Sequence, residues 1–177
     1  MKSAKFIKKA QFIQGLTFEE EGVVYQLPGH GSCFVCGGEN SRGIGLVWYI
    51  KGGVAPASLE RDRAGLPNVL IFSEFSFGLA EQGPPDHAHG GASAAVIDEA
   101  MGNVVWCSQL AVVLANINLD YRLPVPLETP VRVEAWVDKI VGRKAYAVGQ
   151  IVLPEGQVAV AGTGLYVQAP QLFPGLL

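Results

Sequence analysis

The second half of the chain alternates apolar and polar residues with a period of two, which is the pattern of half-buried β-strands. β-Branched residues and turn signals support four strands, over residues 112–123, 131–141, 145–153 and 158–168. Turns separate them at 123–130, at Gly142-Arg143 and at Pro154-Glu155-Gly156. We therefore expect an antiparallel sheet linked by tight turns.

The stretch before these strands has a different pattern, because nearly all of its residues are small or apolar. It runs HGGASAAVIDEAMGNVVWC and predicts a helix over about 91–107. The helix is apolar on most sides and is interrupted by Asp98 and Glu99, so we expect it to be buried. A curved antiparallel sheet wrapped around one long central helix is an α+β architecture.

The first half of the chain is less regular. Residues 44–50 and 69–78 predict strands, and 22–25 predicts an edge strand. Turn-rich or polar segments lie at 27–43, 51–68 and 81–88. We expect a loose arm or short helix over 1–21, one domain over 22–170 and a C-terminal tail over 171–177.

Composition narrows the class of protein. The 177 residues are 49% hydrophobic and 16% charged, so one domain can bury a sizeable core. We expect another subunit to cover part of the remaining apolar surface. The net charge of −3 argues against a nucleic-acid partner, which needs a basic stripe. No apolar run reaches the ~18 residues that a membrane span requires.

The N-terminal segment MKSAKFIKKAQFIQGL is basic and weakly amphipathic. It lacks the apolar centre and cleavage site of a secretory signal, and one short segment offers little area for lying on a membrane. Three cysteines are too few, and odd in number, for a disulfide framework. A cytoplasmic protein without a membrane partner is therefore expected.

Candidate chemistry lies at the mouth of the predicted helix, in His89, Gly90 and Gly91. The first N–H groups of a helix lack internal partners and sit at its positive dipole end, so they suit a carbonyl oxygen that gains negative charge. Asp98, a carboxylate inside an apolar helix, is a candidate base or nucleophile. Together these groups are the elements of an acyl-transfer site.

If these groups form one catalytic site, their spacing demands a homodimer. Nine residues separate His89 from Asp98, which is ~13 Å along a helix axis. Asp98 therefore cannot reach a carbonyl held at Gly90 of its own chain, but it can if a second copy of the helix lies antiparallel alongside. Small residues on the face of Asp98 would allow such a close approach: Gly91, Ala94, Ala95 and Gly102.

Simpler interpretations of the same residues stay open. The two glycines could only form a tight turn, and His89 fits a helix-capping role better than acid–base catalysis. Glu99 points ~100° around the helix from Asp98 and suits a structural salt bridge. Asp98 itself could be a paired core acid.

Other side chains are weaker candidates. Cys33, Cys36 and His30 could be three ligands of a zinc site, but no fourth ligand is evident and a tight turn is the simpler interpretation. Three basic residues at strand ends or turns could meet the phosphate groups of a ligand: Arg122, Arg143 and Lys144. Three aromatic residues could shape an acyl pocket or belong to the core: Phe72, Phe75 and Phe77.

With these motifs the chain resembles the hotdog-fold acyl-CoA thioesterases, most closely the phenylacetic-acid-degradation (PaaI-like) branch. HGGASAAVIDEAMG matches the family's His-Gly-Gly motif and its following Asp-Glu-Ala-Met-Gly, and NINLDYRLPVP matches a family strand. Three further segments are similar to family segments: CFVCGGENSRGIGL, VGRKAY and AVAGTGLYV. The resemblance covers about residues 30–168.

The resemblance implies a hotdog fold and hydrolysis of an acyl-CoA to the free acid and coenzyme A. Asp98 would attack the thioester or activate water, the Gly90 N–H of the facing subunit would form the oxyanion hole, and His89 would shape the loop. A homodimer or dimer of dimers would result. No metal and no cofactor other than the coenzyme A of the substrate is expected. Substrate contacts are expected from Gly91, Gln82, Glu99, Arg143 and Lys144.

Two positions depart from the family pattern. Gly83, next to Gln82, stands where active members often carry Asn or Gln, and Leu114 stands where Ser or Thr often occurs. Both departures remove polar groups that would position water. They keep a second function open, a non-catalytic module that binds acyl-CoA or an acyl carrier. A hotdog dehydratase is less favoured, because His89 lies too far along the helix from Asp98.

Overall fold

The computed structural model describes residues 7–9, 23–52, 69–108 and 110–173. In chain order the elements are β1 (Ile7–Lys9), β2 (Val24–Gln26), β3 (Tyr49–Gly52), β4 (Val69–Phe75), the short 3-10 helix η1 (Leu79–Glu81), α1 (Gly90–Trp106), β5 (Val112–Tyr121), β6 (Val131–Val141), β7 (Lys144–Val152), β8 (Val158–Gln168) and the 3-10 helix η2 (Pro170–Leu172).

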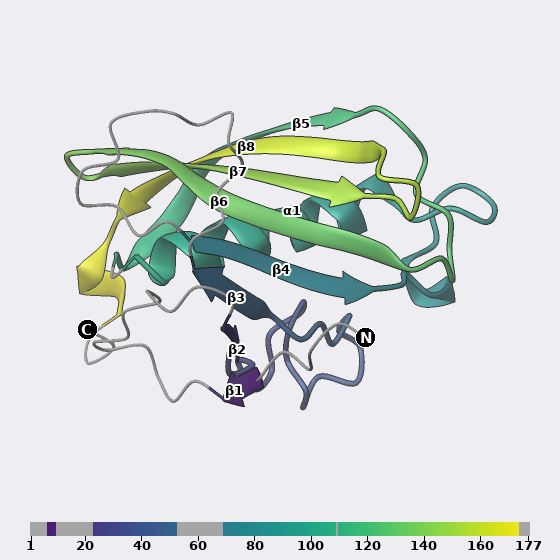
Figure 1. The fold of residues 1–177 in the computed structure, drawn as a ribbon, viewed down its shortest axis with the longest axis horizontal. Coiled ribbons are helices and arrows are strands. Elements are labelled where there is room, and N and C mark those ends of the chain that lie inside the picture. Colours follow the sequence, from purple (N-terminus) through teal and green to yellow (C-terminus); the bar gives the residue numbers. More distant parts are fainter. Residues whose placement is uncertain (1–6, 10–22, 53–68, 109, 174–177) are drawn as a thin grey trace.

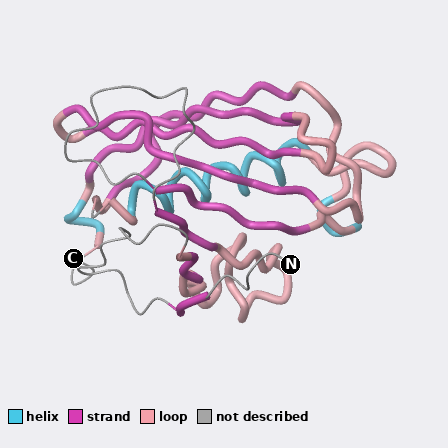
Figure 2. Tube along the Cα trace, viewed as in Figure 1, coloured by secondary structure: helices cyan, strands magenta, loops and turns pink. Residues whose placement is uncertain are grey.

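These strands form one curved sheet with α1 on its inner side (Figure 1). The strand order is β1-β2-β3-β4-β6-β7-β8-β5, and every neighbouring pair is antiparallel except β1 with β2. Figure 2 shows the strands bending over the single long helix. The predicted α+β architecture, a curved sheet wrapped around a central helix, is confirmed.

The helix is buried because the sheet makes room for it. A row of α1 side chains is fully enclosed: Val96, Ile97, Ala100, Met101, Val104 and Val105. A Cβ atom placed on Gly149 of β7 would lie 3.0 Å from both Ile97 and Met101, and one on Gly162 of β8 would lie 3.0 Å from Ile97. Any larger residue at these glycines would push the helix away from the sheet. The prediction of a buried helix over about 91–107 is therefore confirmed, with bounds shifted by one residue.

The predicted strands of the second half lie close to the observed ones, and β6 and β8 have the predicted bounds. The predicted strand over 44–50 is largely wrong, because β3 begins only at Tyr49. The N–H groups of Ile44 and Leu46 donate instead to the carbonyls of Phe34 and Val35, both at 2.8 Å. This segment is bound to the loop before it and has no strand neighbour for its first five residues.

The N-terminal elements differ in part from the expected ones. Residues 7–9 form β1, which pairs with β2, so the strand predicted over 22–25 lies inside the sheet order and not at its edge. The remainder of 1–21, the polar loop from 53 to 68 and residues 174–177 lie outside the described residues. The division into arm, domain and tail stays a prediction. No helix in the described ranges is both long and apolar enough to cross a membrane.

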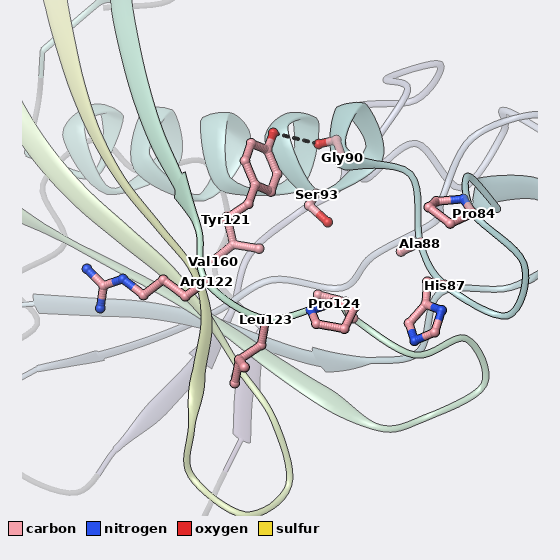
Figure 3. A pocket seen from close by; sticks show the side chains of 11 residues that line it. Pro84, His87, Ala88, Gly90, Ser93, Tyr121, Arg122, Leu123, Pro124 and Val160 are labelled. Atoms are coloured by element: carbon pink, nitrogen blue, oxygen red, sulfur yellow. Dashed lines mark hydrogen bonds between the residues drawn. The ribbon is translucent and has the colours of Figure 1, made fainter.

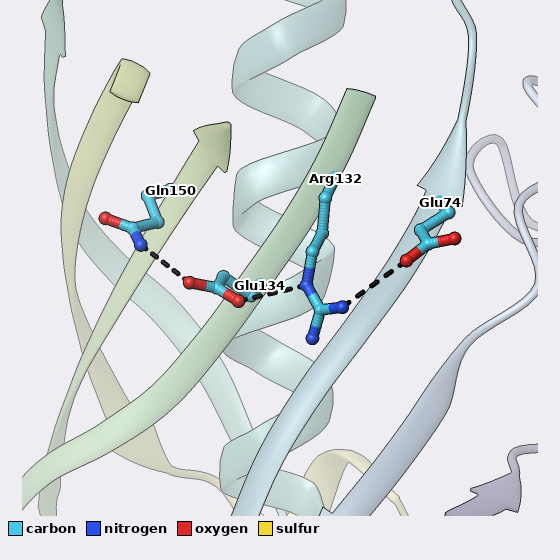
Figure 4. A network of polar contacts seen from close by, with 4 residues as sticks. All are labelled: Glu74, Arg132, Glu134 and Gln150. Carbon is cyan, nitrogen blue, oxygen red and sulfur yellow. Dashed lines mark hydrogen bonds and ion pairs between the residues drawn. The ribbon is translucent and has the colours of Figure 1, made fainter. Parts of the chain in front are cut away.

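The outer face of the sheet carries a chain of polar contacts across β4, β6 and β7 (Figure 4). Arg132 Nη1 lies 3.4 Å from Glu74 Oε1, and Arg132 Nε lies 3.1 Å from Glu134 Oε2. Gln150 Nε2 donates to Glu134 Oε1 at 2.7 Å. The Arg132 guanidinium also covers the ring of Phe72 at 4.3 Å, so Phe72 faces outward. Of the three aromatic residues considered for an acyl pocket, Phe77 is fully buried in the core, and Phe75 packs against it.

Candidate active site

The loop that leads into α1 is held by backbone hydrogen bonds at both ends. Gly83 N donates to His87 O at 3.0 Å, and His89 N donates to Glu81 O at 2.7 Å. A Cβ atom on Gly83 would lie only 2.8 Å from His89 Cα. The close passage of the loop therefore requires glycine at position 83, and the longer polar side chain of the family pattern does not fit this loop conformation.

His89 caps the helix. It has extended backbone angles (φ −66°, ψ 136°), and its Nδ1 accepts a hydrogen bond from Gly91 N at 2.8 Å. Since Nδ1 accepts, the ring proton of a neutral His89 sits on Nε2. The interpretation of His89 as a helix cap is confirmed. Its ring accepts the hydrogen bond of Gly91 N–H, one of the two glycine N–H groups that the sequence indicated as oxyanion donors.

The N–H of Gly90 has a different environment. Within the described part of the chain no acceptor bonds to it, and the first turn of α1 holds no acidic side chain. The Gly90 carbonyl accepts a hydrogen bond from Tyr121 Oη at 2.9 Å, which ties the helix end to β5 (Figure 3). One open donor thus stands at the positive end of the helix dipole, where it can bond an anionic oxygen.

A cavity of about 320 Å³ opens beside this donor (Figure 3). Ser93, one turn after Gly90, is only 2% exposed and lines the cavity with Tyr121 and Arg122. The other lining residues come from the entry loop, the end of β5 and β8: Pro84, His87, Ala88, Leu123, Pro124, Val125 and Val160. The walls are mostly apolar with a few polar groups, as is usual for sites that bind small molecules.

Asp98 lies two turns further along α1 and is half-buried. Tyr166 Oη of β8 lies 2.8 Å from both Asp98 Oδ1 and the Asp98 carbonyl oxygen, and donates to them. Burial raises the pKa of the Asp98 carboxyl, the hydrogen bond from Tyr166 lowers it, and the nearby Glu99 charge raises it, with a net upward shift. A carboxylate with a raised pKa is a stronger base than an exposed one.

Gly90 and Asp98 lie in a segment that resembles a known protein family. Residues 86–160, from the entry loop to the start of β8, match the family model of the Thioesterase superfamily. The matched segment is less than half of the 177-residue chain. The family resemblance inferred from the sequence motifs is thereby confirmed.

Curated relatives of this domain include acyl-coenzyme A thioesterases. THEM4 of Rattus norvegicus is 43% identical over 72 residues, which is 41% of this chain and 31% of the relative. THEM4 of Xenopus laevis is 33% identical over 125 residues, 59% of this chain and 55% of the relative. The chain therefore spans about half or less of the length of the relatives it matches.

Solved structures share the architecture of the domain. The crystal structure of a thioesterase superfamily protein superposes with a TM-score of 0.63 at 28% identity, covering 77% of this chain and 60% of that one. E. coli PaaI, from the phenylacetic acid degradation operon, has a TM-score of 0.53 at 15% identity over 56% of this chain and 76% of its own. A hypothetical thioesterase of Streptococcus pneumoniae TIGR4, solved with coenzyme A, gives 0.54 at 16% identity over 56% and 78%. The predicted hotdog fold is confirmed.

The structure places the remaining predicted site residues in different surroundings. Gln82 is exposed beside the helix entry, where it forms an isolated bridge with Ala88. Glu99 accepts hydrogen bonds from Trp48 Nε1 and Cys33 Sγ, both at 3.0 Å. Its partners among the described residues are therefore neutral donors, and the predicted salt bridge is not formed with them.

Arg143 and Lys144 lie at the far end of the sheet from Gly90. Arg143 Nη2 donates to the carbonyl of Gln168 at 3.0 Å, and Lys144 pairs with Val167 near the start of β5. The register of β5 with β8 places Tyr121, and hence Gly90, at the opposite end. Within one chain these two cations are therefore remote from the open Gly90 donor.

Sequence analysis missed the two tyrosines that hold the site. Tyr121 lies inside the family-like segment NINLDYRLPVP, and Tyr166 lies inside AVAGTGLYV. Each is separated by at least 31 residues from the group that it bonds. The strand pattern marks them as sheet residues, but only the packing of β5 and β8 against α1 shows which helix atoms they reach.

Proposed function

We propose that this chain is an acyl-CoA thioesterase that hydrolyses a thioester to a free acid and coenzyme A. The observation that carries the proposal is the pairing of one open N–H, at Gly90, with one half-buried carboxylate of raised pKa, at Asp98. The relatives named acyl-coenzyme A thioesterase and the neighbour solved with coenzyme A support the same chemistry.

In the proposed reaction Asp98 acts on the thioester carbonyl carbon, either by taking a proton from an attacking water or by attacking directly. The carbonyl oxygen becomes negatively charged in the tetrahedral intermediate, and the Gly90 N–H stabilises it. The C–S bond then breaks and coenzyme A leaves as a thiolate, which needs little help from an acid. On the water route the carboxylic acid forms at once, whereas on the direct route water hydrolyses the acyl-Asp98 anhydride.

The two groups lie on one helix, eight residues apart, or ~12 Å along its axis. In one chain, Gly90 and Asp98 therefore belong to two different sites. A second copy of the chain must supply the missing Asp98 to one site and the missing Gly90 to the other. We accordingly propose a homodimer, which is compatible with a dimer of dimers.

The free edge of the sheet supports a particular dimer. β5 is last in the strand order, so one row of its backbone groups has no partner among the described strands. Tyr121 of β5 lies next to Gly90, and Leu114 pairs with Tyr166, which bonds Asp98. If two β5 strands pair antiparallel with Leu114 opposite the partner's Tyr121, Gly90 of each chain meets the partner's Asp98.

The same dimer gives Arg143 and Lys144 a role. They lie near the Leu114 end of β5 and would therefore be carried to the cavity of the partner subunit. Guanidinium and ammonium groups at that position can bond the phosphates of coenzyme A.

The three cysteines are free thiols, which supports a reducing, cytoplasmic setting.

The function is tested by free-thiol release from a panel of aliphatic and aromatic acyl-CoAs. We expect turnover of at least one member of the panel.

A second candidate function is a module that binds acyl-CoA or an acyl carrier without turnover. Gly83 has no side chain and Leu114 packs against the core, so neither position offers a polar group to hold water. Calorimetry with a non-hydrolysable analogue separates the two: binding without turnover across the panel supports the module, and no binding contradicts both.

Tyr166 is expected to act as a positioning residue for Asp98. Its hydrogen bond lowers the pKa of that carboxyl, so Tyr166→Phe should raise the pKa further. The acidic limb of kcat/KM against pH, which requires ionised Asp98, should then move to higher pH. Tyr146→Phe is the matched control, since the Tyr146 ring lies on β7 in contact with Lys139. A limb that stays in place in Tyr166→Phe would contradict the role.

A further inference from the structure

A second cluster of reactive side chains surrounds Glu99, the residue that follows Asp98 in α1. His30, Cys36 and Glu99 each present one atom of a metal-binding type, and these atoms all lie within 4.8 Å of one another. Cys36 Sγ lies 3.3 Å from His30 Nδ1. Cys33 adds a fourth group, because its Sγ lies 3.0 Å from Glu99 Oε2.

The local backbone brings three of these groups together. Cys33 N donates to His30 O at 2.7 Å, and Gly37 N donates to Cys33 O at 3.1 Å, so two tight turns follow each other. A Cβ atom on Gly37 would lie 2.4 Å from Cys33 N and from Cys33 O, which only glycine avoids. The N–H of Val35 also points at Cys33 Sγ, at 3.4 Å.

Among the described residues Glu99 has no cationic partner. The ion pairs there do not include it. Trp48 Nε1 donates to its Oε1, and Cys33 Sγ donates to its Oε2. The ligand atoms of His30 and Cys36 lie within 4.8 Å of a Glu99 oxygen. A divalent cation among them would balance the carboxylate and convert the thiols to thiolates.

The donor types and distances match one metal. Zn²⁺ prefers four tetrahedral ligands drawn from thiolates, imidazoles and carboxylates, with bonds of ~2.0–2.3 Å. Such bond lengths put neighbouring ligand atoms roughly 3.3–3.8 Å apart. The 3.3 Å from Cys36 Sγ to His30 Nδ1 already lies in that range, and the 3.0 Å from Cys33 Sγ to Glu99 Oε2 lies just below it. The ligand atoms of His30, Cys36 and Glu99, which lie within 4.8 Å of one another, would draw together around the ion.

We propose that His30, Cys33, Cys36 and Glu99 bind a structural Zn²⁺ that fastens the loop before β3 to the middle of α1. Four protein ligands close the coordination sphere, so the metal binds no substrate. The sequence analysis expected no metal because a fourth ligand was not evident. Glu99, 66 residues after Cys33, supplies that ligand through the packing of the loop on the helix. The metal would hold α1 at the residue next to Asp98.

The first test is the metal content of the full chain, purified under reducing conditions without chelator and measured by plasma mass spectrometry. We expect one zinc per chain. Replacement by Co²⁺ should give the absorption bands of thiolate-to-cobalt charge transfer with tetrahedral d–d bands. Cys33→Ser and Cys36→Ser should each lose most of the bound zinc. Cys107→Ser is the matched control and should keep it, because Cys107 lies at the end of α1 outside the cluster.

The wild-type protein keeps the test decisive even where a variant fails to fold. A folded, reduced wild-type chain that takes up neither Zn²⁺ nor Co²⁺ from solution would overturn the proposal. So would Co²⁺ binding without thiolate charge-transfer bands, or full zinc retention in a folded Cys33→Ser/Cys36→Ser variant. Removal of the zinc by a chelator should lower Tm, since the metal binds only the folded state.

Discussion

Asp98→Asn is expected to lower kcat for thioester hydrolysis by roughly 10²–10⁴-fold, the range found when a positioned base is removed. The amide has the shape of the carboxylate, and its oxygen can still accept the hydrogen bond that Tyr166 donates. It cannot, however, take a proton from water or attack a carbonyl carbon. The measurement is free-thiol release under saturating acyl-CoA, with active sites counted by binding of a non-hydrolysable analogue.

Stability should move in the opposite direction. Burial raises the pKa of Asp98 above its unfolded value, so the ionised form costs folding free energy once the pH exceeds the unfolded pKa. Asparagine removes that cost, and Asp98→Asn should therefore melt at an equal or higher temperature near neutral pH. Asp86→Asn is the matched control, because Asp86 is exposed and asparagine tolerates its positive φ of 63°. Equal rates for wild type and Asp98→Asn would exclude Asp98 as the catalyst.

Gly90→Pro is expected to lower kcat by about 10²–10³-fold, the usual cost of losing one oxyanion donor. Proline deletes the N–H and is well tolerated at the first position of a helix. It also requires extended backbone angles in the residue before it, and His89 already has them (φ −66°, ψ 136°). The substitution therefore replaces the N–H hydrogen by a ring carbon, which can donate no hydrogen bond, while preserving the helix.

Gly90→Ala is the matched control for that variant. Its Cβ would meet the Tyr121 ring at 3.4 Å, an ordinary contact, and it keeps the N–H, so most of the activity should remain. Circular dichroism and Tm report whether both variants keep the helix. A Gly90→Pro enzyme that is folded and as fast as Gly90→Ala would exclude the Gly90 N–H as the oxyanion donor.

Combining the two inactive variants tests the site that spans two subunits. In a mixed dimer the Gly90→Pro chain supplies an intact Asp98 and the Asp98→Asn chain supplies an intact Gly90, so one of its two sites is complete. Random pairing makes half of the dimers mixed, which should restore about a quarter of the wild-type activity. Mixed dimers are isolated with two different affinity tags and verified by native mass spectrometry. Verified mixed dimers with no recovery would contradict a site shared between subunits.

The hydrophobic pattern predicted most of the fold because each prediction depended on local physics. The period-two alternation and the turn residues around Gly142 and Gly156 predicted the strands of the second half within a few residues, and both glycines have the positive φ that tight turns need. The error over 44–50 has a nonlocal cause. Leu46, Trp48 and Ile50 are buried, as the pattern required, but Val47 is exposed. The N–H groups of Ile44 and Leu46 donate to the 33–36 turn and not to a strand.

The candidate site could be predicted only in part for the same reason. His89, Gly90 and Asp98 lie in one motif, so sequence spacing alone was enough to show that they cannot meet within one chain. Tyr166 and Tyr121 gave no such signal, because a tyrosine in a strand looks the same in the sequence whether or not its hydroxyl bonds a helix atom.

By itself the sequence determined the helix, its sheet and the spacing of the candidate catalytic groups, since periodicity and spacing along one element are properties of neighbouring residues. Tertiary structure alone decided which donors remain open and what each carboxylate contacts. Gly91 N–H is taken by His89 whereas Gly90 N–H is left without an acceptor among the described residues. Asp98 and Glu99 are adjacent in the chain, yet the helix turn directs one to Tyr166 and the other to Cys33 and Trp48. Hydrogen bonding and burial depend on groups that folding brings from distant positions, and linear spacing does not specify them.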